Sequence, residues 1–162
     1  MKKSNLKELL TQKIQALYDI EIELVKALPK LGRAATDQAL KEGFRNHLAE
    51  TRTQVERLER VFKHLDAKPK KLKVEAIRGM VKDGQWVIKN VKPNEALDSN
   101  LVRIAQYMEH YEMAGYMAAI AWATTLGESA VAGLLEDTLK EEQEADKKLA
   151  ELGRELDTKL VA

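Results

Sequence analysis

The sequence contains no cysteine, and this absence excludes several kinds of site at once. Disulfides, thiolate zinc sites and iron–sulfur clusters all require cysteine sulfur. Any metal ion that this chain binds must therefore be held by oxygen or imidazole ligands.

Net charge and long apolar runs are also scarce. The chain has 27 basic and 26 acidic residues, which gives no electrostatic reason to expect nucleic acid or an anionic membrane as a partner. The longest apolar stretch, Met113 to Leu126, is interrupted by threonines and too short to cross a bilayer. The segment Met1 to Leu10 lacks the continuous apolar run of a signal peptide. We therefore expect a cytoplasmic protein that binds neither nucleic acid nor membranes.

Proline and glycine are few, with three and eight residues among 162, so long helices with few breaks are expected. The length fits a single domain, residues 1–162. Apolar residues recur at intervals of three and four, which is the period of a helix with one buried face. This spacing predicts four long helices at about residues 4–31, 37–65, 95–126 and 129–156.

Capping residues mark the ends of these helices. Ser4, Asp37 (or Thr36) and Ser129 are the predicted N-caps. Glycine at positions 32 and 127 is predicted to end the first and third long helices.

The segment 66–94 between the two helix pairs has a weaker pattern. Two prolines and two glycines in it favour only short helical pieces, so it is predicted to be a crossover. The turn between the first and second long helices is short, and so is the turn between the third and fourth. Each pair is therefore predicted to form an antiparallel helical hairpin. A helix of about 25 residues is about 37 Å long, and the segment 66–94 is long enough to span that distance. The crossover can therefore return along the whole bundle, which makes the second and third long helices parallel. The predicted fold class is an all-α four-helix bundle with ferritin-like connectivity.

Single glutamates interrupt the apolar inner lines of three of these helices. Glu21 is the one polar member of the line from residue 10 to residue 31, and Glu112 has the same position in the line from 101 to 126. Glu142 lies in the middle of the last line, where Thr138 is the only other polar member. Glu109 precedes Glu112 by one turn. These positions predict carboxylates inside the bundle.

The inner line of the second helix is ambiguous, because it can be drawn through Leu48 and Val55 or through His47 and Gln54. In either case His47, Glu50 and Gln54 share one stripe of the helix. Glu21 and Glu50 are about equally far from the turn between their helices, as are Glu112 and Glu142 from theirs. We therefore expect these four glutamates at one level of the bundle.

Ionised carboxylates buried without partners cost several kcal/mol each, so something must compensate them. The inner lines offer no lysine or arginine, and a cation is the simplest answer. Iron and manganese are the leading candidates. The alternative is that each glutamate reaches solvent at the edge of the bundle or pairs with a lysine.

The three histidines differ in their expected roles. His47 can hydrogen-bond a metal ligand or bind metal directly, and both interpretations stay open. His110 points about 100° away from its neighbour Glu109, which favours a supporting or surface role. His64 is near a helix end and is predicted to be solvated.

The aromatic residues near the acids are predicted to pack rather than to carry redox chemistry. We expect the tyrosine rings to fill the core while their hydroxyls find partners. The tryptophans are also predicted to pack. These residues are Tyr18, Tyr107, Tyr111, Tyr116, Trp86 and Trp122.

Four segments together carry a family resemblance. They are "YDIE" (18–21), "HLAET" (47–51), "EHYE" (109–112) and "EEQEAD" (141–146), in this order and around this crossover. With these segments the chain resembles, over nearly its whole length, the ferritin-like YciE/YciF-type family of bacterial stress-associated proteins. The resemblance implies a ferritin-like bundle, a dinuclear metal site and a homodimer.

The resemblance also implies a ligand set. The implied members are Glu21, Glu50, Glu109, Glu112 and Glu142, and Gln54 and Asp146 match second positions on their helices. Ferritin-like proteins often carry a histidine three residues after a helix glutamate, but those places hold Thr53 and Ala145 here. The resulting site is richer in oxygen and poorer in imidazole, which favours manganese or a different iron reactivity. The absence of cysteine excludes a rubredoxin-like module in this chain.

Three functions remain open from the sequence. The first is a di-iron or di-manganese protein that reacts with oxygen or peroxide, in which Glu50 and Glu142 would bridge the two ions. The second is a non-enzymatic stress protein that serves as an assembly or partner-binding module, with metal structural or absent. The third, weaker interpretation is iron storage, which requires a hollow cage of many subunits.

Overall fold

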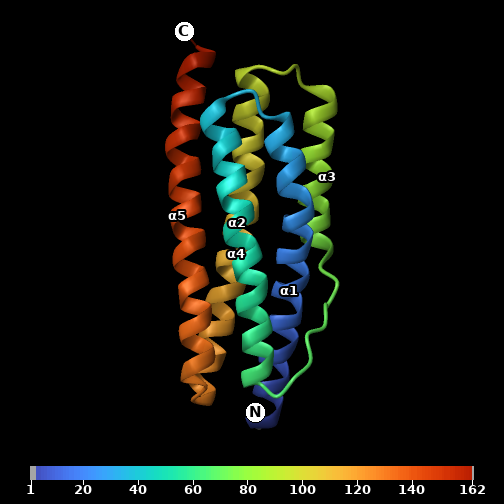
Figure 1. Ribbon diagram of the computed structural model, residues 1–162, viewed down its shortest axis with the longest axis vertical. Coiled ribbons are helices and arrows are strands. Elements are labelled where there is room, and N and C mark those ends of the chain that lie inside the picture. Colours follow the sequence, from blue (N-terminus) through green and yellow to red (C-terminus); the bar gives the residue numbers. More distant parts are fainter. Residues whose placement is uncertain (1–2, 162) are drawn as a thin grey trace.

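The computed structural model describes residues 3–161, with side chains from residue 5 onward. Five helices and no strand occur in this range (Figure 1). They form the ferritin-like four-helix bundle that was predicted, with one additional helix in the crossover. The helices are α1 (Lys3–Ala34), α2 (Gln38–His64), α3 (Glu75–Asn90), α4 (Glu95–Leu126) and α5 (Ser129–Leu160).

The two hairpins pack side by side in the predicted arrangement. Helices α1 and α2 form one antiparallel pair, and α4 and α5 form the other. Helix α1 also contacts α4, while α2 contacts α5, so the four long helices surround one core. Helices α2 and α4 run in the same direction, as the length of the crossover predicted (Figure 1).

The inner lines identified from the sequence form the core. Leu10, Ile14, Leu17 and Leu24 of α1 are all buried, and so is Glu21 among them. Burying an aliphatic side chain of this size contributes about 1.5–3 kcal/mol, so these lines determine which face of each helix turns inward. In α2 the buried line passes through Gln54, whereas Leu48 is only partly buried, which resolves the ambiguity of that helix.

Two of the predicted helix ends are confirmed. The side chain of Asp37 accepts a hydrogen bond from the backbone N–H of Leu40 at 3.1 Å and caps α2. Gly127 follows α4 with φ at 78°, the left-handed conformation that glycine adopts at no steric cost.

Three of the predicted helix ends are wrong. Ser4 lies inside α1 because that helix already includes Lys3. Gly32 also lies inside α1, which continues to Ala34. Gly32 lies beside Phe44 of α2, where a Cβ atom would be in ordinary contact at 3.5 Å. The packing of α1 on α2 continues past the glycine and outweighs its helix cost. Ser129 is the first residue of α5, and the capping position belongs to Glu128 without a side-chain cap.

The crossover contains one helix of 16 residues, not the short helical pieces that were predicted. Ile77 and Val87 are buried on its inner face. Gly84 is buried between them, where a Cβ atom would lie 3.5 Å from Leu31 and 3.7 Å from Ile104. Helix α3 thus packs on α1 and α4 at this glycine, and the packing stabilises the helix.

Two buried aspartates outside the predicted set join the elements. Asp19 of α1 accepts hydrogen bonds from the backbone N–H of Val74 at 2.9 Å and from Arg78 at 2.6 Å, so it anchors the start of α3. The bond from Arg78 lowers the pKa of Asp19.

Asp98 of α4 has an equivalent role at the other end of the bundle. It accepts bonds from the backbone N–H groups of Thr36 and Asp37, both at 2.7 Å, and from the Thr36 hydroxyl. One carboxylate therefore fixes the α1–α2 turn against the second hairpin.

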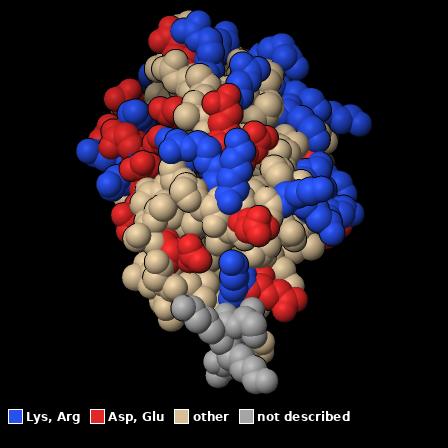
Figure 2. Space-filling view, turned by 60° about the horizontal axis from the view of Figure 1, so that its bottom comes forward, with Lys and Arg blue, Asp and Glu red and all other residues tan. Residues whose placement is uncertain are grey.

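The molecular surface carries charges of both signs. Figure 2 shows basic and acidic side chains on the face in view, with uncharged areas between them. Within residues 3–161, no helix is long and apolar enough to span a membrane.

Candidate metal centre

Four carboxyl groups from three helices meet near the middle of the bundle. Glu21 comes from α1, Glu109 and Glu112 from α4, and Glu142 from α5, and all four are buried. The positions of Glu21, Glu112 and Glu142 follow from the inner lines, because packing the apolar members of each line turns its glutamate inward as well. The structure thus brings together four of the glutamates that the sequence singled out.

His47 of α2 completes this cluster. Its Nε2 atom lies 3.1 Å from Oε1 of Glu109 and 4.0 Å from Oε2 of Glu142, and its side chain is 11% exposed. Ligand atoms of His47, Glu109, Glu112 and Glu142 all lie within 4.8 Å of one another. One imidazole and several carboxylates at this separation could hold a metal ion.

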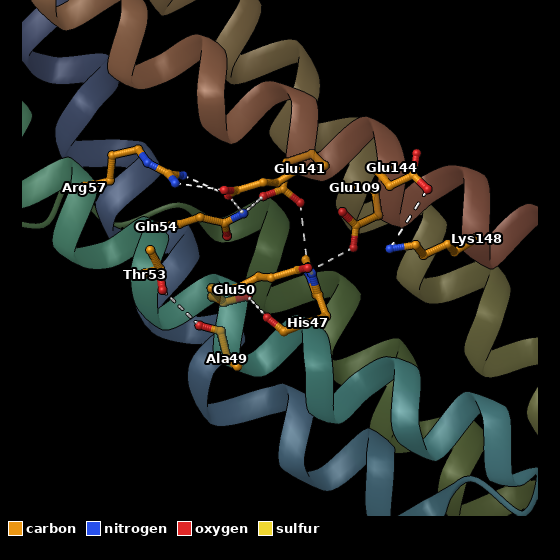
Figure 3. Close-up of polar contacts among 12 residues, drawn as sticks. His47, Ala49, Glu50, Thr53, Gln54, Arg57, Glu109, Glu141, Glu144 and Lys148 are labelled. Carbon is orange, nitrogen blue, oxygen red and sulfur yellow. Dashed lines mark hydrogen bonds and ion pairs between the residues drawn. The ribbon is translucent and has the colours of Figure 1, made fainter.

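The structure places Glu50 and Asp146 outside the cluster. The side chain of Glu50 is 44% exposed, and its Oε2 lies 3.6 Å from Nδ1 of His47. In Figure 3, His47 lies between Glu50 and Glu109. Asp146 contacts Nε2 of His110 at 3.0 Å and accepts a hydrogen bond from Gln106 at 3.1 Å. His110 thus has the supporting or surface position that was expected, and His64 is exposed.

Gln54 reaches the cluster as a hydrogen-bond donor. It is buried, and its amide donates to Oε1 of Glu142 and, at 3.1 Å, to Oε2 of Glu141. Arg57 binds both oxygens of Glu141 at 2.8 Å (Figure 3). Arg57 also donates to the Thr138 hydroxyl at 2.7 Å. Sequence reasoning missed Arg57 and Glu141, although the polar Thr138 on the inner line of α5 was a signal for a partner there.

Seven buried side-chain atoms lack a hydrogen-bond partner among the residues that the structure describes, and all of them belong to this cluster. Buried polar atoms are normally partnered, since an unpaired one costs about 1–3 kcal/mol and more if it is charged. Most of these atoms are carboxylate oxygens, which are hard ligands suited to iron or manganese. The donor set therefore fits a metal ion. The atoms are Glu21 Oε2, His47 Nδ1, Gln54 Oε1, Glu109 Oε2, both oxygens of Glu112, and Glu142 Oε2.

Burial and mutual repulsion oppose ionisation of these acids. Burial raises the pKa of Glu21 to about 7, although the bond from Tyr116 acts in the opposite direction. Burial and the carboxylates of Glu21, Glu142 and Glu109 raise the pKa of Glu112 well above its usual value. Burial and the neighbouring Glu109 do the same for Glu142. Without a cation the cluster therefore holds protons, and a metal ion would have to displace them.

In contrast to the acids, the imidazole of His47 is favoured in its charged form. Burial favours its neutral form, but the contact with Glu109, the contact with Glu50 and the charge of Glu142 together outweigh burial. The pKa of His47 is therefore raised well above its usual value. The contact between His47 and Glu50 in turn lowers the pKa of Glu50.

Two of the tyrosines have the packing role that was predicted. Tyr116 is fully buried, and its hydroxyl donates to Oε1 of Glu21. Burial and the adjacent Glu21 raise the pKa of Tyr116 well above its usual value. Tyr18 packs edge-on against Phe62, and its hydroxyl donates to Glu59 at 2.9 Å.

The same prediction is wrong for three other aromatic residues. Tyr107 is 64% exposed, Trp86 is 63% exposed, and Tyr111 is also exposed. The line of α4 that contains Tyr107 and Tyr111 lies opposite its buried line, so proximity to the acids in sequence does not bring these rings inside. Trp122 is partly buried against the core, as predicted, with the Lys13 ammonium 6.0 Å from its ring centre.

The fold and the cluster together define a class: ferritin-like helical bundles with a buried histidine and glutamate cluster that could hold a metal ion. Within this class, the chain belongs to the family described as domain of unknown function DUF892, whose model matches residues 5–161.

Named relatives agree with this assignment. Protein YciF of Escherichia coli strain K12 is 38% identical over 136 residues, which cover 83% of this chain and 82% of YciF. The crystal structure of the E. coli stress protein YciF matches with a TM-score of 0.91 at 34% identity, over 95% of this chain and 98% of the other.

Another solved structure is YcfI of Rhodopseudomonas palustris, described as a candidate structural protein. It matches with a TM-score of 0.87 at 38% identity, over 90% of this chain and 92% of its own. The expected resemblance to the YciE/YciF-type family is therefore confirmed.

Proposed function

We propose that this chain holds two ions of iron or manganese in the His/Glu cluster and reacts there with oxygen or peroxide. The observation that carries the proposal is the set of unpartnered carboxylate oxygens buried between the two hairpins. Each such oxygen is unfavourable in the folded protein unless a cation or a proton compensates it.

Each side chain of the cluster has a distinct role in this proposal. His47, Glu109 and Glu142 would hold the first ion. Glu112 has two unpartnered oxygens and would serve both ions, while the free Oε2 of Glu21 would bind the second. This assignment gives Glu112 the bridging role that the sequence suggested for Glu50.

Surrounding side chains orient these ligands. Gln54 fixes one oxygen of Glu142, and Tyr116 fixes one oxygen of Glu21. Glu50 lies on the Nδ1 side of His47, where it would favour the tautomer that leaves Nε2 free for metal.

Two adjacent ions, when bound, would supply the two electrons that reduce peroxide to water or oxygen to peroxide. The chain's own contribution is the exclusion of water. Glu21 and Glu112 have no exposed surface, so a reaction at the centre is shielded from bulk solvent.

Metal content tests the first part of the proposal. Untagged protein is loaded anaerobically with ferrous iron or manganese, desalted and measured by mass spectrometry. We expect about two ions per chain, and a large loss of metal in Glu142→Ala. Glu136→Ala, an exposed acid on the same helix, is the matched control and should keep its metal. Wild-type protein that retains no metal after loading would contradict the proposal.

Peroxide consumption by the loaded protein tests the second part. We expect the reduced iron or manganese form to consume peroxide, and Glu142→Ala to lose this activity while Glu136→Ala keeps it. Equal rates in the wild type and in Glu142→Ala would show that the reaction does not occur at this cluster.

A second candidate function is assembly without catalysis, which the structural-protein description of the Rhodopseudomonas relative favours. The outer face of α4 supports it, because Glu109 and Glu112 are the only Asp, Glu, Lys or Arg residues from Ile104 to Leu126 and both are buried. The exposed His110 in this stretch contacts Asp146 of α5. An uncharged helix face of this length fits an interface with a second copy of the chain.

The oligomeric state tests this interface. By sedimentation velocity, we expect a homodimer that Met117→Glu on α4 converts to a monomer. Trp86→Glu on α3 is the control, because Trp86 is also an exposed apolar residue, and it should leave the dimer intact. If the wild type dimerises but neither binds metal nor consumes peroxide, the assembly function replaces the catalytic one.

A further inference from the structure

A cavity of about 420 Å³ opens between α2 and α5 and reaches the candidate centre. Its floor is formed by α1 and α4, where Leu24, Leu28 and Met108 are buried. Phe44 and Leu152 form its walls, and His47 and Glu109 lie at its inner end. A cavity of this size, mostly apolar and with a few polar groups at one end, has the character of a small-molecule site.

The mouth of the cavity is acidic. Four glutamates from α2 and α5 line it on the solvent side, against one lysine. That lysine, Lys148, lies 4.0 Å from Glu144, so its charge is already shared with another acid. The field at the mouth therefore attracts a cation and repels an anion. The four glutamates are Glu42, Glu50, Glu151 and Glu155.

We propose that this cavity binds a linear apolar molecule with a cationic end, whose apolar part points inward to His47 and Glu109 while its ammonium group lies at the glutamates of the mouth. This inference names the substrate class of the proposed centre and, for the reaction at the inner end, rests on the proposed function. The binding itself depends only on the cavity and its charges.

The shape of the cavity favours a small molecule over a second protein chain. Its floor lies on α1 and α4, behind α2 and α5. An occupant must therefore pass between α2 and α5 to reach Leu24 and Met108. A helix has a diameter of about 10–12 Å with its side chains, and it cannot pass between two helices that are themselves in contact. An unbranched alkyl chain can enter such a gap.

Isothermal titration calorimetry with octylamine, octanol and octanoate tests the inference. These probes share one alkyl chain and differ in the charge of the end group. We expect octylamine to bind about ten-fold more tightly than octanoate, with octanol between them. The order should be the same in metal-free and metal-loaded protein, so a missing metal centre would not conceal failure of the cavity, or the reverse.

Two variants locate the binding. Gly43 lines the cavity and has open space where a Cβ would lie, so Gly43→Phe should fill the gap and weaken octylamine binding about ten-fold. Gly133→Phe, at an equally open helix position on α5 outside the cavity, should change nothing. The double change Glu151→Lys and Glu155→Lys should reverse the order, so that octanoate binds more tightly than octylamine.

The inference is overturned if the three probes bind with equal affinity. It is also overturned if neither Gly43→Phe nor the double change at Glu151 and Glu155 alters the binding of octylamine. It is also overturned if Gly43→Phe converts a dimer to a monomer in sedimentation velocity, because a second copy would then cover the mouth.

Discussion

The hydroxyl of Tyr116 on α4 donates a hydrogen bond to Oε1 of Glu21 on α1, and both side chains are fully buried. This bond joins the two hairpins beside the candidate metal centre. It leaves Oε2 of Glu21 as the only oxygen of that carboxylate without a partner. Tyr116 therefore determines which oxygen of Glu21 is available to a metal ion.

Removing this hydroxyl should destabilise the metal-free protein. In Tyr116→Phe, Oε1 of Glu21 loses its donor, and we expect a loss of about 1–3 kcal/mol in the free energy of unfolding near pH 8. The loss should be smaller near pH 5, where Glu21, with a pKa of about 7, is protonated. Urea unfolding measures both values. Tyr111→Phe, at an exposed position, is the control, and equal losses in the two variants would refute the proposed role of the buried bond.

The stability of the metal-free protein should fall as pH rises. The pKa of Glu21 is about 7 in the folded chain against 4.5 for the free side chain, so between these values the folded state binds a proton that the unfolded state has released. The difference is worth about 3 kcal/mol, present at low pH and lost by about pH 7. Glu112 and Glu142, whose pKa values are also raised, act in the same direction. His47 does too, because its raised pKa confers stability that is lost as pH rises through the folded value.

Urea midpoints of the metal-free protein between about pH 5 and pH 8 measure this effect. Asp19, whose pKa is lowered, opposes it only near and below its usual value of 3.8. Replacing Glu112 by glutamine should flatten the profile. Stability that rises over this range would contradict the assignment of raised pKa values to the cluster.

Replacing Glu112 by leucine should stabilise the metal-free protein and abolish stabilisation by metal. The change substitutes an apolar side chain for a buried acid, so we expect the metal-free protein to gain about 1–4 kcal/mol. The same variant should lose the additional stability that loading with iron or manganese gives the wild type. Thermal unfolding with and without metal checks both expectations. A less stable metal-free variant would indicate that Glu112 supports the fold by itself.

Asp98 should matter for the fold but not for the metal. Asp98→Ala leaves the backbone N–H groups of Thr36 and Asp37 without their acceptor, and we expect a loss of about 3 kcal/mol in urea unfolding. Metal content should stay at the wild-type level, because Asp98 is at the end of the bundle. Asp83→Ala, at an exposed position on α3, is the control, and similar losses in both variants would contradict this role.

Periodicity predicted the parts of the site that replace apolar residues in long, regular lines. Glu21, Glu112 and Glu142 were recognisable because all or nearly all the other members of their lines are apolar. Asp98 lies one step before Leu101 on the same line of α4, so extending that line would have found it. His47 stayed ambiguous because α2 has two lines of similar character.

Other features were hidden because they depend on which helices pack together. Asp19 faces α3, and nothing in the spacing of α1 indicates that a further helix covers that side. Gly84 was interpreted as a helix breaker, although it lies buried inside α3 where that helix packs against Leu31 and Ile104. The partners of Arg57 lie on α5, far away in the chain, so its role could not be predicted from local pattern.

The origin of the cluster in both hairpins has a consequence for biosynthesis. Glu21 and His47 belong to the first hairpin, whereas Glu109, Glu112 and Glu142 belong to the second. A ribosome that has completed only α1 and α2 has produced two of these five side chains, and the last arrives with α5. The nascent chain therefore cannot assemble the site before α5 has been translated as far as Glu142. In the proposed function, metal acquisition would therefore be a late event of maturation, and a product truncated before Glu142 would not sequester iron or manganese.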